Sequence, residues 1–190
     1  MFRFLARTTA ATAAVFALPA LLGAAAKPVA SHWVLQSSVL TYHVTHPLHK
    51  VDGVSHAARG MGVCAQGVCR FLIADQVKTF TTGDSARDIH MQQVVHAALY
   101  PLITVRTTVP QADLTASQIQ ATLVVQFAGQ TVTFPKLTFA LHRQNGDIRL
   151  TGAIPATVRE FKIKPPQLLF MPINNQIPIT VVMLWAPAKS

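Results

Sequence analysis

Residues 117–129 read SQIQATLVVQFAG, an alternation of polar and apolar side chains that predicts a half-buried β-strand. Successive side chains of a strand point to opposite faces. One face of this segment is therefore apolar, and it carries Ile119, Ala121, Leu123, Val125 and Phe127. Gly129-Gln130 then turns the chain into another apolar run, so the segment predicts the first half of a β-hairpin.

The same alternation recurs along most of the chain beyond residue 30. The other predicted strands cover 39–46, 69–77, 102–109, 131–142, 148–152 and 177–185. Pro135-Lys136 separates two runs of opposite apolar parity, which predicts a bulge or bend. Asn145-Gly146 predicts a tight hairpin turn. Short strands joined by turns indicate an antiparallel sandwich or an up-and-down barrel of about eight strands. A barrel of that size has room for side chains or one small ligand.

The stretch DSARDIHMQQVVHAALYP breaks this pattern and predicts one helix. Its apolar residues Ile89, Val94 and Ala98 follow a helical spacing. Asp84 or Ser85 can accept hydrogen bonds from the first-turn amides, as a helix N-cap does. The proline that ends the stretch stops the helix. The segment 154–172 is rich in proline and predicts irregular chain.

The N-terminus predicts export. The chain has 190 residues, and residues 1–26 place Arg3 and Arg7 before an uncharged stretch that ends in Ala24-Ala25-Ala26. This order is typical of a signal peptide, and we place its cleavage after Ala26. An uncleaved membrane anchor is the alternative. The remaining residues, 27–190, are enough for one domain with its own core.

The charge of the chain favours an anionic partner. There are 16 Lys and Arg against 7 Asp and Glu, and only two of these bases precede residue 27. For an exported protein the expected partner is an anionic membrane surface. The bases are dispersed and no nucleic-acid-binding motif is present, so we expect no nucleic acid. A generally solvated basic surface is the alternative.

The two cysteines, Cys64 and Cys69, flank the turn-forming pair Gln66-Gly67. In a hairpin they face each other across the strands, within reach of a disulfide. Export to an oxidising compartment also favours that bond. The alternative, a metal or redox site, lacks a second cysteine pair and the Cys-x-x-Cys spacing.

Several segments, taken in order, resemble the YceI-like family of exported bacterial proteins. The matching stretches are SSVLTYHVTH ending at His46, KVDGVS, TFTTGDSARDIHM, LYPLITV, LVVQFAGQTVTFP and VREFKI. The resemblance spans about residues 33–186. It implies an eight-stranded, lipocalin-like antiparallel barrel in the periplasm, with one helix across an end. It also implies a long apolar ligand in the central pore, such as a polyisoprenoid or an isoprenoid quinone, and no catalytic mechanism. The cysteine pair and the proline-rich tail depart from the family pattern.

The histidines of TYHVTHPLHKVDGVSH resemble a metal cluster, but a strand separates them. His43 and His46 point to opposite faces of the predicted strand, and His49 and His56 fall in or beyond the loop. We therefore expect no metal site. His46 has the parity of the inward residues, so we expect it near the barrel mouth. Our hypothesis is that His46 and Tyr42 orient the polar head of a lipid. A histidine satisfied by a backbone carbonyl is the alternative.

The cluster Arg87, Asp88 and His90 resembles a catalytic site only in composition. On a helix, Arg87 and His90 share a face while Asp88 points elsewhere. We expect these residues to fix the helix as a lid, and with no Gly-x-Ser-x-Gly motif we expect no enzyme.

The function expected from the sequence is therefore that of an exported, periplasmic or secreted lipid-binding barrel without a covalent cofactor. The alternative is a ligandless accessory subunit of a membrane-bound complex, anchored by a retained N-terminal helix. The expected ligand contacts are the inward residues of the strands: Leu40, Tyr42, Val44, His46, Phe71, Ile73, Ile103, Val105, Leu123, Val125 and Phe127.

Overall fold

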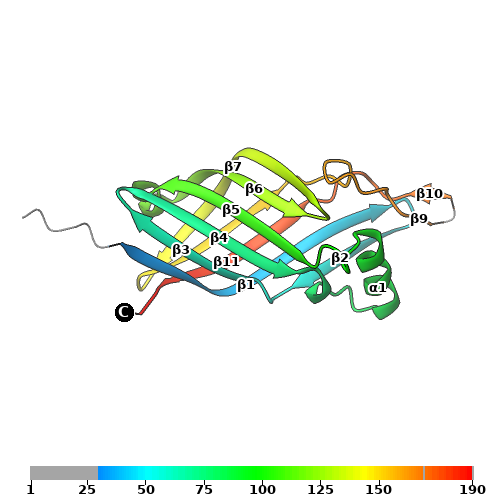
Figure 1. Ribbon diagram of the computed structural model, residues 1–190, viewed down its shortest axis with the longest axis horizontal. Helices are drawn as coiled ribbons and strands as arrows, with labels where there is room; N and C mark the ends of the chain where they lie inside the picture. Colours follow the sequence, from blue (N-terminus) through cyan, green and yellow to red (C-terminus); the bar gives the residue numbers. More distant parts are fainter. Residues whose placement is uncertain (1–29, 169, 190) are drawn as a thin grey trace, which may run out of the picture.

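The computed structural model describes residues 30–168 and 170–189, so the predicted signal peptide or anchor at 1–26 lies outside the described residues. Figure 1 shows an elongated barrel with the start of β1 and the C-terminus at one end and α1 at the other. No helix within the described ranges has the length and hydropathy to span a membrane. The barrel strands are β1 (Ser31–His46), β3 (Arg59–Ala65), β4 (Val68–Gln76), β5 (Leu102–Pro110), β6 (Gln118–Phe127), β7 (Gln130–Gln144), β8 (Asp147–Ile154) and β11 (Ile179–Pro187).

These eight antiparallel strands form a closed barrel, which confirms the predicted fold class. Each strand pairs with its neighbours in the order β11-β8-β7-β6-β5-β4-β3-β1, and pairing of β1 with β11 closes the sheet. Closure leaves no free sheet edge around the barrel. In β6 the burial alternates as the sequence predicts, with Ile119, Ala121, Leu123 and Val125 buried.

The predicted irregularities of β7 are also confirmed. Leu123 pairs with Phe134, whereas Ala121 pairs with Leu137, so the two strands shift register there. Lys136 lies within this bulge with a φ of +53°. Phe134 precedes the bulge at an even position and Phe139 follows it at an odd one, yet both lie in the core. The bulge therefore keeps the apolar side chains of both halves of β7 facing inward.

β1 extends the barrel beyond its closed sheet. Its first residues pair with β3, and its last seven pair with β2 (His49–Ser55). A register shift between Leu35 and Ser37 moves the inward face from odd to even positions. Leu35 and Leu40 therefore both face the core. The β1–β2 hairpin lies beside a second hairpin, β9 (Gln167–Leu168) and β10 (Met171–Pro172), at the end where α1 lies (Figure 1).

The helix α1 (Ser85–Val94) begins where the sequence predicts. Asp84 is its N-cap and accepts a hydrogen bond from the Arg87 amide at 3.1 Å. The predicted apolar face is confirmed at Val94 and wrong at Ile89, which is 56% exposed, while Ala98 lies beyond the end of the helix. The helix turns Met91 and Val94 toward the barrel. Ile89 and Val94 are five residues apart and so point to different sides of an α-helix.

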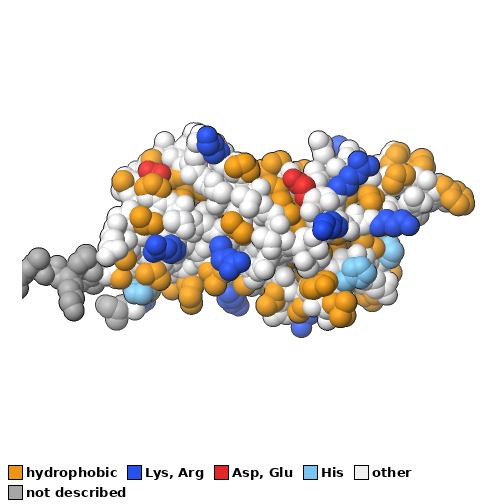
Figure 2. All heavy atoms as spheres, turned by 45° about the horizontal axis from the view of Figure 1, so that its top comes forward, with side chains coloured by type: hydrophobic (Ala, Val, Ile, Leu, Met, Phe, Trp, Pro, Cys, Tyr) orange, Lys and Arg blue, Asp and Glu red, His pale blue; other side chains and the backbone are white. Residues whose placement is uncertain are grey.

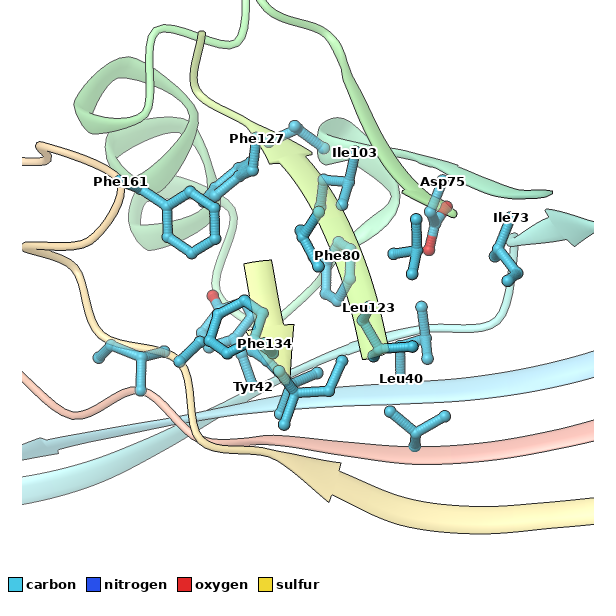
Figure 3. Close-up of a pocket in the computed structure, with 18 of the residues that line it drawn as sticks. Leu40, Tyr42, Ile73, Asp75, Phe80, Ile103, Leu123, Phe127, Phe134 and Phe161 are labelled. Carbon is cyan, nitrogen blue, oxygen red and sulfur yellow. The ribbon is translucent and has the colours of Figure 1, made fainter. Parts of the chain in front are cut away.

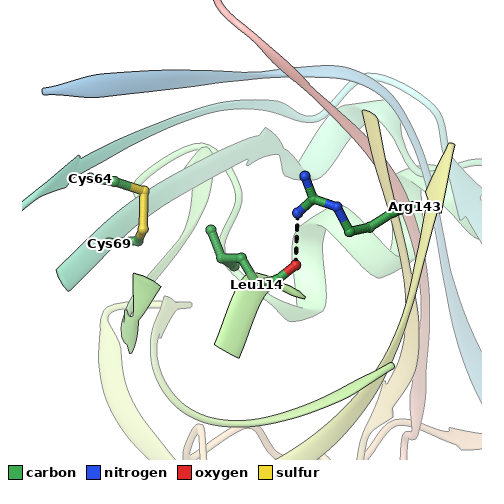
Figure 4. The surroundings of a disulfide bond; sticks show 4 residues. All are labelled: Cys64, Cys69, Leu114 and Arg143. Carbon is green, nitrogen blue, oxygen red and sulfur yellow. Dashed lines mark hydrogen bonds between the residues drawn. A yellow bond between two sulfur atoms is a disulfide. The ribbon is translucent and has the colours of Figure 1, made fainter. Parts of the chain in front are cut away.

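The opposite end of the barrel carries the disulfide. Cys64 and Cys69 pair directly across the β3–β4 hairpin and are bonded, as predicted, with their Cα atoms 3.9 Å apart. Close by, the short helix η2 (Gln111–Thr115) places Leu114 in the core. The Arg143 guanidinium donates to the Leu114 carbonyl at 2.9 Å, which ties η2 to β7 (Figure 4). Side chains such as Leu114 therefore fill this end of the barrel, beside the disulfide-linked hairpin.

Candidate functional site

The inward faces of the strands enclose one long cavity of about 560 Å³ (Figure 3). Its wall is almost entirely aliphatic and aromatic. All eleven side chains expected to contact a ligand lie on this wall: Leu40, Tyr42, Val44, His46, Phe71, Ile73, Ile103, Val105, Leu123, Val125 and Phe127. A volume of this size is ordinary for a small-molecule site.

The cavity opens at the end where α1 lies. The lining side chains that are exposed to solvent gather there, and they are His49, Arg87, His90 and Gln167. At the disulfide end the lining residues Trp33, Leu114 and Trp185 are each less than 10% exposed. We call the residues His49, Arg87, His90 and Gln167 the mouth.

The segment between β8 and β11 contributes wall residues that the sequence did not reveal. Phe161 is buried, and its ring packs against the rings of Phe127 at 5.3 Å and Phe134 at 6.3 Å. Ile163 and Ile173 also line the cavity. This proline-rich segment has no alternation, so its inward residues carry no periodic signal. The VREFKI motif was the one indication that Phe161 matters.

His49, expected in or beyond the loop, lies just beyond it, because it begins β2 directly opposite His46. The two imidazole rings lie 5.2 Å apart. His43 lies on the outer face as predicted, 2.8 Å from both the Asp52 carboxylate and the Thr180 hydroxyl. His56 follows β2 and is exposed. Within the described ranges, no three His, Cys, Asp or Glu side chains are close enough to hold a metal ion.

His46 is held by the backbone, which is the alternative reading of its role. It is 4% exposed, and its Nδ1 accepts a hydrogen bond from the Leu48 amide at 3.2 Å. Its Nε2 therefore carries the proton and donates to the Met171 carbonyl at 3.2 Å. Both nitrogens are occupied, so His46 joins the β1–β2 and β9–β10 hairpins and offers a lipid head no free polar atom.

We therefore expect His46→Ala to lower stability and leave ligand affinity nearly unchanged. The substitution removes two hydrogen bonds, one with the Leu48 amide and one with the Met171 carbonyl, each worth about 0.5–1.5 kcal/mol. Urea unfolding measures that loss, and titration with a polyisoprenoid measures affinity. His43→Ala on the outer face is the matched control. A tenfold loss of affinity in a folded His46→Ala protein would show that the imidazole contacts the ligand.

Tyr42 offers a polar atom to the cavity. Its ring lies over Gly53, where a Cβ atom would collide with it, and 5.7 Å from the ring of Phe80. Burial and the nearby charge of Asp88 raise the pKa of Tyr42 to about 12, against an opposing effect of Arg87. The phenol therefore keeps its proton at neutral pH. No described residue forms a hydrogen bond with its hydroxyl, which is available to a ligand.

The side chains of Arg87 and His90 point to one face of α1 and that of Asp88 to another, as the helix geometry predicts. Arg87 and His90 line the cavity, whereas Asp88 does not. Asp88 instead accepts hydrogen bonds from the Thr82 amide and hydroxyl and from the Thr81 hydroxyl. Desolvation raises the pKa of Asp88, but these hydrogen bonds and Arg87 outweigh it and lower the pKa overall. Asp88 thus fixes the chain that enters α1.

Solved structures share this architecture. One is a polyisoprenoid-binding domain from Saccharophagus degradans implicated in plant cell wall breakdown, with a TM-score of 0.68 and 14% identity over 82% of this chain and 98% of that one. BcnA from Burkholderia cenocepacia has a TM-score of 0.63 and 14% identity, over 77% and 95% of the two chains. A Campylobacter jejuni YceI protein has a TM-score of 0.50 and 15% identity, over 64% and 73%.

The closed barrel, its apolar cavity and the helix across one end define a lipocalin-like β-barrel protein. Within that class, the fold is that of the YceI proteins, as the sequence motifs predicted. No family model matches the chain, and no curated protein matches it by sequence. At this distance the likeness defines the architecture, and the ligand has to be argued from the cavity itself.

Proposed function

We propose that this protein binds a long apolar lipid, such as a polyisoprenoid or an isoprenoid quinone, inside its barrel. The observation that carries the proposal is the apolar cavity of about 560 Å³ inside the barrel, open at one end and filled by side chains at the other. Burial of a lipid chain there yields about 0.8 kcal/mol per methylene group. A few isoprene units therefore give useful affinity without a covalent cofactor or a catalytic step.

The proposed place of action is the periplasm or the cell exterior. The signal-like residues 1–26 support this location, and so does the Cys64–Cys69 disulfide, which persists in an oxidising compartment. If residues 1–26 are retained, the barrel is membrane-anchored instead. Intact-mass measurement of the protein from membrane and soluble fractions distinguishes a chain that starts near Lys27 from the full-length chain.

The direct experiment is native mass spectrometry of the purified protein, followed by solvent extraction and identification of any released lipid. We expect a bound apolar lipid, or uptake of an added polyisoprenoid or quinone by the emptied barrel. A barrel that carries no lipid and takes up none of the lipids offered would instead support the ligandless accessory subunit of a membrane complex.

We also propose that the mouth end meets an anionic membrane, from which the lipid enters. At this end the tips of the β1–β2 and β9–β10 hairpins expose apolar side chains to solvent: Leu48 is 59% exposed and Phe170 is 95% exposed. Figure 2 shows apolar, basic and histidine side chains gathered at this end of the molecule. The neighbouring segments 48–52 and 159–164 carry four basic residues, Lys50, Arg159, Lys162 and Lys164, against two acids, Asp52 and Glu160. Apolar tips flanked by positive charge suit a surface of anionic lipid headgroups.

Sedimentation with vesicles measures this contact. We expect binding to vesicles that contain phosphatidylglycerol, weaker binding to pure phosphatidylcholine, and loss of binding at high salt. The double variant Leu48→Ser/Phe170→Ser should bind several-fold more weakly. The control is Met61→Ser/Leu72→Ser, which removes two exposed apolar side chains paired across β3 and β4. Equal loss in both double variants would contradict docking through the mouth.

A further inference from the structure

The end of the cavity opposite the mouth is formed by the short helix η2, which connects β5 to β6. Leu114 is the one residue of this helix that is buried, at 6% exposure. Its side chain joins the hydrophobic core and lines the cavity. The helix therefore folds back over the open end of the strands and places one leucine across the path of a ligand chain.

The strand register shows that Leu114 lies at the limit of the cavity. The inward residues of β5 run from Ile103, nearer the mouth, to Val109, and both line the cavity. Val109 pairs with Cys69, which pairs with Cys64. Among the described lining residues there is neither of these cysteines, although both are buried. The cavity therefore ends at the level of the disulfide, where Leu114 covers it.

The helix η2 is held in place by two separate parts of the barrel. The Gln111 amide, at its start, donates to the Gly67 carbonyl in the β3–β4 turn at 2.8 Å. The Arg143 guanidinium of β7 donates to the Leu114 carbonyl at 2.9 Å (Figure 4). Because these hydrogen bonds fasten η2 on both sides, a ligand chain that advances through the cavity meets Leu114 as a fixed boundary.

The depth of the cavity follows from the length of β5. The six residue steps from Ile103 to Val109 span about 20 Å along the strand. Barrel strands tilt by about 35–45°, so this span is about 15 Å along the barrel axis. With carbon–carbon bonds of about 1.5 Å, an extended chain advances about 1.25 Å per carbon. About a dozen carbons therefore fit between the level of Ile103 and the floor.

We propose that Leu114 sets the longest apolar chain that this barrel encloses, an inference that rests on the lipid-binding function proposed above. Each methylene group that leaves water for the cavity raises affinity up to about fourfold. Once the chain end meets Leu114, a further methylene group stays at the mouth in contact with water and adds little. Affinity therefore rises with chain length and then levels off. A longer polyisoprenoid enters by one end and keeps the rest of its chain outside the mouth.

Straight-chain 1-alkanols measure this limit one carbon at a time. Homologues from 1-octanol to 1-octadecanol displace a fluorescent apolar reporter from the delipidated protein. For the wild type we expect the logarithm of affinity to rise linearly with length up to a break. Leu114→Ala removes three carbons from the floor, so the break should move two or three carbons longer. Alkanols beyond the wild-type break should then bind about tenfold or more tightly, and shorter ones within about twofold of the wild type.

The matched control is Leu123→Ala, the same substitution at a second leucine that lines the cavity and is also 6% exposed. Leu123 lies on the side wall, where it pairs with Thr107 and Phe134. Its loss widens the cavity without deepening it, so the break should stay at the wild-type length. Leu114→Val is the milder variant of the floor. It removes one carbon and should move the break by one carbon.

Two kinds of failure are distinguishable. A series without a break, a break that stays in place in Leu114→Ala, or an equal shift in Leu123→Ala would overturn the role of Leu114 and leave lipid binding intact. If neither the alkanols nor a polyisoprenoid displace the reporter, the proposed function itself is overturned. If Leu114→Ala does not fold, the one-carbon shift in Leu114→Val decides.

Discussion

Replacing Val125 by tryptophan should weaken lipid binding about 100-fold while the barrel still folds. Val125 lies on β6 midway along the cavity wall, 7% exposed, and pairs with Val105 and Val132 on the two adjacent strands. An indole there occupies the space that a lipid chain would use. Exclusion of about four carbons costs about 3 kcal/mol of burial, which corresponds to about a 100-fold loss of affinity. Titration with a polyisoprenoid measures this loss.

The neighbouring residue provides the matched control. Val124 lies on the same strand with the opposite orientation and does not line the cavity. Val124→Trp therefore adds the same indole to the outside of the barrel, and affinity should stay within about twofold of the wild type. Thermal unfolding of both variants shows that they are folded. Full affinity in a folded Val125→Trp protein would mean that the ligand binds elsewhere.

Replacing Trp185 by alanine should give the largest loss of stability, about 3–5 kcal/mol. Trp185 is 5% exposed on the closing strand β11 and pairs with Leu35 and Ile148 on the strands beside it. Its ring meets Phe71 edge-on at 5.0 Å. It also fills the space left by Gly60, where a Cβ atom would come within 2.6 Å of the indole. The Trp185 side chain on β11 thus reaches Gly60 on β3 and Phe71 on β4, beyond the β1–β11 pair that closes the barrel.

Urea unfolding measures this effect as a lower midpoint with an unchanged slope, since the surface exposed on unfolding stays nearly the same. Trp185→Phe is the graded comparison. A phenyl ring retains part of the contact with Phe71, so this variant should lose less than half of what alanine loses. A loss below about 1 kcal/mol in Trp185→Ala would show that the strand closure does not depend on this packing.

Much of the barrel could be predicted because strand periodicity is a local property. The inward and outward faces of β6 follow from alternation alone, and so does the parity change at Pro135-Lys136 that became the bulge in β7. The disulfide followed from a two-residue turn between Cys64 and Cys69. In each case the side chain's environment is set by neighbours a few residues away.

Predictions failed where the environment depends on distant segments. Alternation correctly turned His46 inward, but only the folded chain brings the Met171 carbonyl to its ring, 125 residues away. Ile89 was placed on the wrong face of α1 because helical spacing alone does not show which face the barrel covers. The sequence placed His49 only in or beyond the loop, and the pairing of β2 with β1 is what sets it opposite His46.

The sequence by itself therefore determined antiparallel strands, their apolar face and the eleven inward side chains, because alternation specifies which way each strand residue points. The choice of a barrel over a sandwich came from the resemblance to the YceI-like family. Only the tertiary structure decided what each polar residue does. It occupied both nitrogens of His46 with backbone groups and left the hydroxyl of Tyr42, on the cavity wall, without a hydrogen bond from any described residue. A hydrogen bond depends on where two atoms meet in space, and the Met171 carbonyl that meets His46 comes from a distant segment of the chain.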